Sequence, residues 1–131
     1  MPADQLSTLE FSAWAGLLRT HATLVRELDR ELDTGHALPL TQYEVLLHLE
    51  LAPNRRLRMT EHARSVLLSQ SGVTRLVDRL EAQGLVERAP CAEDRRVLWA
   101  QMTDAGHRRY TEARPTVIAG IRARFLDRFH D

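Results

Sequence analysis

The stretch from Leu68 to Gly106 constrains the fold of this chain more than any other. Its first half repeats apolar residues at helical spacing, which predicts a helix with one buried stripe: Val73, Leu76, Val77 and Leu80. Either Ser69 or Ser71 can cap the start of this helix. Gly84 stands where a left-handed C-cap is favoured, and Leu85 can make the apolar contact that accompanies such a cap. We therefore expect the helix to stop just before Gly84.

Two short strands are predicted after this helix, Leu85–Ala89 and Val97–Met102. In the second strand, Leu98, Ala100 and Met102 alternate with the residues of the other face, Val97, Trp99 and Gln101. The loop between the strands is charged and ends in two adjacent arginines. The sequence thus predicts a helix followed by a β-hairpin with a basic tip.

Helices are also predicted on the amino-terminal side. A long amphipathic helix is expected from Phe11 to Leu32, ended by Gly35 and Pro39, and its apolar face carries Trp14, Leu17, Leu18, His21, Leu24, Val25, Leu28 and Leu32. A capping box, Thr41–Glu44, is expected to open a second helix that runs to about Leu51 with inward Tyr43, Leu46, Leu47 and Leu49.

Pro53 and Asn54 should break the second helix, and Thr60 can cap a short third helix that ends near Leu67. Thr103 is expected to cap a fifth helix, in which Pro115 marks a break or a kink. The last segment repeats apolar residues down one face: Val117, Ile118, Ile121, Phe125 and Phe129.

Two helices, a tight turn, a helix sized for a DNA groove and a β-hairpin make a winged helix-turn-helix, a mainly α (α+β) fold. We expect residues 37–103 to form this lobe. The terminal helices, residues 1–36 and 104–131, are more apolar than one small lobe can cover. Since a long exposed apolar stripe is a liability unless it meets a copy of itself, we predict a dimerisation region and a twofold homodimer.

Composition fits one domain of 131 residues with 44% apolar content, and aromatic residues at 5% argue against an aromatic-lined enzyme pocket. The net charge is zero, and all 18 basic residues are arginine. Between Asn54 and Arg109, however, 11 arginines face 7 acidic residues, which leaves +4 there and −4 elsewhere. Such a dipolar chain has a basic face that attracts phosphate.

Several functional classes have little support. No nucleophile-elbow, P-loop or dinucleotide motif is present, so we expect no enzyme, catalytic residue or cofactor. The single cysteine, Cys91, excludes an internal disulfide and fits a reducing cytosol. No signal pattern or apolar run near the roughly 20 residues of a membrane span is present, so we expect a cytoplasmic protein with no membrane partner, at the nucleoid when bound to DNA.

The outward face of the helix before Gly84 carries the residues that can bind a duplex. Arg75 can fork onto a guanine, Thr74 can touch a thymine methyl, and Gln70 or Ser71 can bond a base or a phosphate. Arg79 lies one turn further and is expected on the DNA backbone. The alternative is a solvated face on which Asp78 and Glu81 pair with the arginines of the same helix.

The hairpin favours the duplex-binding interpretation. Arg95 or Arg96 at its tip can enter a narrow minor groove, and Asp94 can hold the arginine extended by pairing with it. An ordinary polar turn is the alternative.

The chain resembles the MarR family of bacterial winged-helix regulators over nearly its whole length. The resemblance lies in LLRTHATLVRELDRELD, in LTQYEVLLHL and above all in SGVTRLVDRLEAQGLVER and EDRRVLWAQMTDAG. It implies a homodimer that binds a pseudo-palindromic operator, usually represses, and is often released by a small phenolic or aromatic ligand. It also implies a role for each matching position: base contacts for Ser71, Thr74 and Arg75, the backbone for Arg79, orientation for Asp94, and the minor groove for Arg96, which Arg95 could share.

Two departures from the family pattern are present. The third helix has His62-Ala63 where the family usually shows Leu-Ala, which puts its local packing in question. The segment after Pro115 is short, so an abbreviated dimer arm is expected.

The family's ligand cleft would be lined here by Trp14, Leu17, His21, Tyr43, Leu47 and His48, although a packed core is the simpler interpretation for each. The position of Cys91 near arginines suggests a thiol sensor, but we favour the interpretation that Cys91 is an incidental loop residue. The six histidines form no metal-ligand motif, so no metal site is predicted. A protein–protein adaptor that kept the fold without operator binding is the rival from another class.

Overall fold

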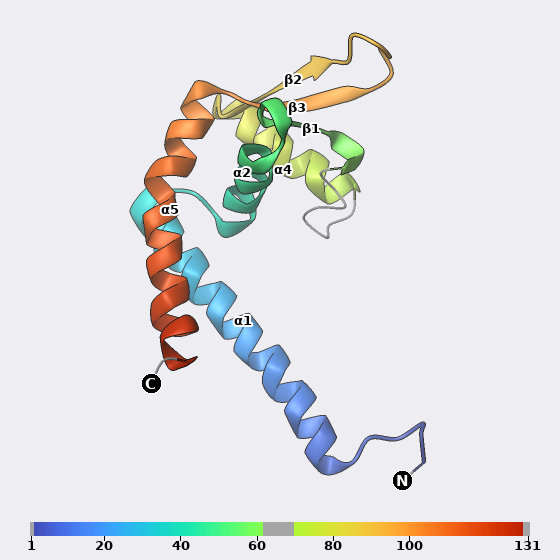
Figure 1. Cartoon of the computed structure of the whole chain (residues 1–131), viewed down its shortest axis with the longest axis vertical. Coiled ribbons are helices and arrows are strands. Elements are labelled where there is room, and N and C mark those ends of the chain that lie inside the picture. The colour runs from blue at the N-terminus through green and yellow to red at the C-terminus, as the bar shows by residue number, and fades with distance from the viewer. Residues whose placement is uncertain (1, 62–69, 130–131) are drawn as a thin grey trace.

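Two long helices, α1 (Thr8–His36) and α5 (Asp104–Arg124), pack side by side and form an arm below a lobe that holds the other helices and the strands (Figure 1). The computed structural model describes residues 2–61 and 70–129. Helix α1 projects well past the carboxyl end of α5, where one short turn, η2 (Leu126–Phe129), closes the described chain (Figure 1). The arm and the lobe therefore meet at only one end of α1.

Helix α1 is longer at both ends than the sequence predicts. It begins with a capping box that was not predicted: Ser7 Oγ accepts from the Glu10 N–H, and Glu10 Oε1 accepts from the Ser7 N–H. At the other end the left-handed residue is Ala37, with φ of 51°, and Gly35 lies inside the helix. The prediction that Gly35 ends this helix was therefore wrong.

Helix α2 (Leu40–Leu51) is not opened by the predicted capping box, because the helix already begins at Leu40, after Pro39. Its first N–H is instead capped from α1, where Asp29 Oδ1 accepts from the Leu40 N–H at 2.7 Å. Three of the four predicted inward residues are buried, and the fourth is partly buried: Tyr43, Leu46 and Leu49, then Leu47.

The predicted break after α2 is confirmed by a short turn, η1 (Pro53–Arg55). A strand that was not predicted follows, β1 (Arg56–Arg58), and it forms a three-stranded antiparallel sheet with β2 (Val86–Pro90) and β3 (Leu98–Met102). The order is β1-β3-β2, so β1 pairs with a strand about 40 residues away. The two predicted strands are confirmed to within one residue at each end.

Helix α4 (Gln70–Ala82) confirms the stripe predicted from the sequence, since its four residues are at most 8% exposed: Val73, Leu76, Val77 and Leu80. Gly84 has φ of 75°, and the Leu85 N–H donates to the Leu80 carbonyl at 2.9 Å, as a left-handed C-cap requires. Ser71 lies within the helix and is not its cap, while Ser69 lies outside the described residues.

The third predicted helix is described only in part. Met59, Thr60 and Glu61 are helical, so Thr60 is not the residue that precedes the helix. The remainder, with His62 and Ala63, lies outside the described residues.

Helix α5 begins as predicted, because Thr103 Oγ1 accepts from the Gly106 N–H at 3.0 Å. The Thr103 hydroxyl also donates to the Gly84 carbonyl at 2.7 Å, which joins the start of α5 to the end of α4. Any Cβ on Gly106 would lie 2.1 Å from the Leu85 carbonyl oxygen, so this contact requires glycine. Pro115 lies inside the helix and does not break it. No helix in the described ranges is long and apolar enough to cross a membrane.

Candidate nucleic-acid interface

The face of α4 opposite its buried stripe is open to solvent. Arg75 and Arg79 are exposed there, and Thr74 is partly buried. Gln70 and Ser71 lie in the first described turn, and the structure does not describe their side chains. The two arginines predicted to face DNA are thus on the outward side of the helix.

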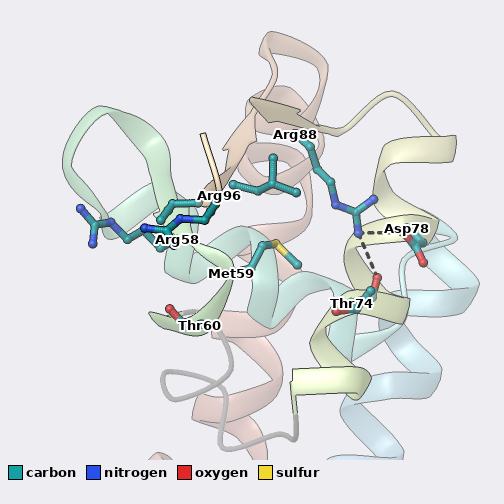
Figure 2. A pocket seen from close by; sticks show the side chains of 9 residues that line it. Arg58, Met59, Thr60, Thr74, Asp78, Arg88 and Arg96 are labelled. Carbon is teal, nitrogen blue, oxygen red and sulfur yellow. Dashed lines mark hydrogen bonds and ion pairs between the residues drawn. The ribbon is translucent and has the colours of Figure 1, made fainter. Parts of the chain in front are cut away.

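The two acids on the outward face of α4, Asp78 and Glu81, pair with an arginine of strand β2 and not with the arginines of their own helix. Arg88 on β2 makes ion pairs with Asp78 at 2.7 Å and with Glu81 at 3.1 Å, and its Nη2 donates to the Thr74 carbonyl at 3.4 Å (Figure 2). In residues 2–61 and 70–129, neither Arg75 nor Arg79 forms an ion pair. The alternative in which Asp78 and Glu81 neutralise these arginines was therefore wrong.

Arg88 was not predicted as a site residue. Its side chain is only 22% exposed, and with both acids it ties the hairpin to the middle of α4. A planar guanidinium suits such a role because it can donate to several acceptors in a fixed geometry. The only sign of this role in the sequence is that Asp78 and Glu81 lie three positions apart on one helix face. Their spacing does not indicate which arginine they pair with.

The loop between β2 and β3, residues 91–97, is the wing, and it projects at one end of the sheet (Figure 1). Asp94 Oδ1 accepts from the Arg96 backbone N–H at 3.0 Å and from Arg96 Nε at 3.4 Å. The Arg96 side chain is 92% exposed, and Arg95 is exposed as well. The predicted pairing of Asp94 with a wing arginine is present, and its partner is Arg96.

Cys91 at the base of the wing is buried, at 5% exposure. The pKa of its thiol lies below the ordinary value because backbone N–H groups of Glu93, then of Asp94, donate to the sulfur. The Cys91 N–H also donates to the Val97 carbonyl at 3.0 Å. A sensing thiol needs access to solvent, so these contacts favour an anchoring role for Cys91 in the wing.

The six residues predicted to line a ligand cleft do not share one cavity. Leu17 and His21 line a cavity of about 300 Å³ whose other walls come from α1 and α5, and the remaining four residues are not among its walls. Trp14 is 55% exposed on α1. Tyr43 lies in the core, stacked on Tyr110 at 5.3 Å, and burial raises its pKa. Leu47 and His48 are partly buried on α2.

No cluster of three or more potential metal ligands is present in the part of the chain that the structure describes. The geometry assembles instead an arginine-bearing helix, an arginine-tipped wing and an ion-paired link between them. This arrangement can place positive charge along two neighbouring grooves of a duplex.

Comparison with known proteins agrees with this geometry. The family model described as MarR family matches residues 36–97. Sco3205 of Streptomyces coelicolor, a MarR family transcriptional regulator solved in complex with DNA, is 32% identical with a TM-score of 0.92. The alignment covers 96% of this chain and 82% of that one.

Two further relatives carry functional information. CouR of Rhodococcus jostii RHA1, solved with p-coumaroyl-CoA bound, is 28% identical with a TM-score of 0.74, over 84% of this chain and 76% of that one. The transcriptional repressor MprA of Escherichia coli K12 is 33% identical over 75 residues, 57% of this chain. That match spans only 43% of the repressor's own length.

Proposed function

Since the chain belongs to the MarR family, we propose that it is a transcriptional regulator, most simply a repressor, that binds duplex DNA as a homodimer. The observation that carries this proposal is the joint exposure of arginines on α4 and on the wing, held together by Arg88. Sco3205, which shares the fold across 96% of this chain, was solved with DNA bound.

In the proposed complex, α4 enters the major groove and the wing reaches the neighbouring minor groove. Arg75 forks onto a guanine, with Ser71 and Thr74 beside it and Gln70 at the helix start. Arg79 binds the backbone. Arg96, oriented by Asp94 and assisted by Arg95, enters the minor groove, where A·T-rich sequence deepens the negative potential.

The arm, residues 1–36 and 104–131, is proposed as the dimerisation region. Its large apolar side chains are 47% to 80% exposed at seven positions: Leu9, Phe11, Trp14, Leu17, Leu18, Phe125 and Phe129. So many large exposed apolar side chains in one region are unusual on a monomer and suit a twofold contact with a second copy. In a dimer the two α4 helices should lie about 34–36 Å apart, one turn of B-form DNA.

An effector is proposed at the cavity between α1 and α5. Its walls are mostly apolar, with His21 and Arg124 at hand for a polar group, and they belong to the arm that sets the dimer geometry. CouR binds p-coumaroyl-CoA, a ligand with a phenolic group. A small aromatic ligand that prefers a dimer with misplaced α4 helices would shift the population away from DNA.

The test uses a duplex that the purified protein selects from a random pool. Binding should weaken steeply between 50 and 200 mM salt, roughly in proportion to the number of phosphates contacted. Arg75→Ala should cost about 1–3 kcal/mol on the selected duplex and little on random duplex. Arg96→Ala should cost most where the flanks are A·T-rich. An adaptor without operator binding would show no salt slope, and equal losses on both duplexes for Arg75→Ala would remove the base-reading role.

A further inference from the structure

The outer face of the three-stranded sheet carries a basic cluster that the proposed DNA contacts do not use. Helices α2 and α4 pack on the inner face, where Ala100 is part of the buried core and Leu57 packs against it (Figure 1). The register places Arg58 directly opposite Trp99, and Leu57 opposite Ala100. Side chains alternate between the two faces along a strand, so Arg56, Arg58 and Trp99 share the outer face, away from α4.

Two arginines share one aromatic ring in this cluster. The Cζ atom of Arg56 lies 4.5 Å from the centroid of the Trp99 ring, and that of Arg58 lies 5.4 Å from it. Neither arginine forms an ion pair in residues 2–61 and 70–129. The acid nearest to them in the sequence, Glu61, accepts from the Arg58 backbone N–H at 3.3 Å. The cluster therefore concentrates positive charge that no ion pair in the described ranges neutralises, and it favours an anionic partner.

Arg56 is the more available of the two arginines. The Nε atom of Arg58 is buried and has no hydrogen-bond partner among the described residues, so it cannot donate to a ligand. Arg56 is partly exposed, and in the ranges that the structure describes none of its side-chain nitrogens is buried without a partner. Stacking on Trp99 uses the plane of the guanidinium and leaves its edge, which carries the N–H donors, for an acceptor. Arg56 is therefore the donor of this cluster, and Arg58 adds positive charge beside it.

One acid lies on the same face and determines the side from which an anion can approach. Glu87 on β2 and Arg56 on β1 both lie opposite Gln101 of β3. Adjacent strands are about 4.8 Å apart, so about 10 Å separates the two backbones. Glu87 is exposed and forms no ion pair within the described part of the chain. An anion on this face is therefore favoured at the β1 side and disfavoured at the β2 side.

The place of this face in the proposed complex identifies the anion. With α4 in the major groove and the wing in the adjacent minor groove, the sheet face away from α4 points along the duplex, beyond the wing. Two sugar–phosphate strands border a minor groove, one on the α4 side of the wing and one on its far side. We propose that Arg56, supported by Trp99 and Arg58, binds a phosphate of the far strand at the outer flank of each half-site.

The reach of the wing allows this contact. Trp99 follows Arg96 by three residues, so at most about 10 Å of chain separates them at about 3.3 Å per residue. The minor groove is about 7.5 Å deep. When the Arg96 side chain extends toward the floor of the groove, the Trp99 ring and the Arg56 guanidinium therefore lie close to the phosphates at its rim.

This inference rests on the proposed function and adds a phosphate contact outside the two groove contacts. The probe is the selected duplex with a methylphosphonate at the same position of each half-site, which removes the charge of one phosphate per half-site. Wild-type protein should lose about tenfold in affinity at one position, on the strand that borders the minor groove on the far side of the wing. Arg56→Ala should lose about tenfold on the unmodified duplex and nothing more at that position, as expected for two partners in one interaction.

The salt dependence gives a second, independent measurement. Arg56→Ala should reduce the slope of log affinity against log salt by about 0.9 for each half-site, equally on selected and random duplex. Arg55→Ala is the matched control, because Arg55 is the adjacent residue and pairs with Glu50 instead of stacking on Trp99. If Arg56→Ala fails to fold, Arg56→Met keeps an apolar stem over Trp99 and removes the charge. Glu87→Gln should strengthen binding by about twofold, because it removes the acid on the same face.

Three results would overturn the inference. Arg56→Ala could keep the wild-type response to every methylphosphonate and the wild-type salt slope, while wild type binds the duplex normally; the flank contact alone would then be wrong. A hexaglutamate peptide could bind wild type but not Arg56→Ala, without competing with duplex, which would assign this face to an acidic protein instead. Wild type could show no salt-dependent duplex binding at all, and the proposed function would fall with the inference.

Discussion

Helix α2 in the lobe buries six of its 12 residues, whereas α1 in the arm buries one, Leu32, of its 29. The lobe core is closed by the chain itself, with Val45, Leu46, Val77 and Leu80 fully buried. Along the first half of α1 the large apolar side chains are 51% to 80% exposed: Leu9, Phe11, Trp14, Leu17 and Leu18. The difference indicates that a single chain buries the apolar core of the lobe but leaves much of the apolar surface of the arm exposed. This exposed surface is the physical basis for the proposed dimer.

Polar contacts join the two regions. Asp29 of α1 caps α2, and His107 Nδ1 of α5 lies 2.9 Å from Glu50 Oε2 of α2. Within the arm, Arg124 of α5 pairs with Glu27 and Glu31 of α1. Such contacts orient the helices relative to one another more than they stabilise the folded chain, because exposed ion pairs contribute only about 0–1 kcal/mol. The angle between arm and lobe should therefore respond to whatever binds between α1 and α5.

The largest expected effect lies in the lobe. Leu80→Ala should lower the free energy of unfolding by about 2–5 kcal/mol, because it removes buried methyl groups and leaves a cavity in a closed core. Denaturant unfolding measures this loss. Leu51→Ala is the control, since Leu51 is 73% exposed and should change stability by less than about 0.5 kcal/mol. Similar losses for both variants would contradict a self-contained lobe.

In the arm, substitution should affect association rather than folding. Trp14→Ala should weaken the dimer by about 2 kcal/mol, roughly 30-fold in the dissociation constant, as expected for a tryptophan within an interface. Sedimentation velocity across a concentration series measures this shift, and Leu51→Ala should not move it. A wild-type protein that is monomeric at every concentration would contradict the proposal that the arm forms a dimer interface.

The link between α4 and the wing should contribute less to stability than to binding. Arg88→Ala should cost about 1 kcal/mol of unfolding free energy, because its acidic partners can be hydrated once it is gone. Duplex affinity should fall on selected and random sequences alike, since the wing is no longer held against α4. Arg88→Lys, which keeps the charge without the fork, should recover only part of that affinity. Full recovery by lysine would show that charge alone suffices.

The smallest effect is a response of the arm to acid. The hydrogen bond from Arg124 lowers the pKa of Glu31 below its ordinary value of 4.5 in the folded state. A lowered native pKa contributes stability above about pH 4.5 and loses it as the pH falls through the native value. Because Glu31 is partly exposed, we expect less than about 1 kcal/mol. Wild type should exceed Glu31→Gln in stability at pH 7 and approach it at pH 3; a difference that is the same at both pH values would exclude this ion pair as its source.

The sequence was sufficient where one segment carries its own signal. The stripe from Val73 to Leu80, the left-handed Gly84 and the Thr103 cap were all predicted, because each depends on residues within about one turn of each other. The exposed arginines of α4 follow from the same local periodicity, and those of the wing follow from the charged loop between two predicted strands. The roles assigned to those arginines on DNA remain predictions.

The tertiary structure decided what depends on distant partners. Strand β1 forms because it pairs with β3, Asp29 caps α2 in place of the predicted capping box, and Arg88 forms ion pairs with the acids of α4. A cavity of about 530 Å³, lined by residues of β1, α4 and the hairpin, likewise forms only where these elements meet. Periodicity and capping are set by neighbours along the chain and can be read from it. A hydrogen bond or an ion pair between remote residues depends on how the elements pack, because several partners of equal chemistry compete until the core fixes which of them lies within reach.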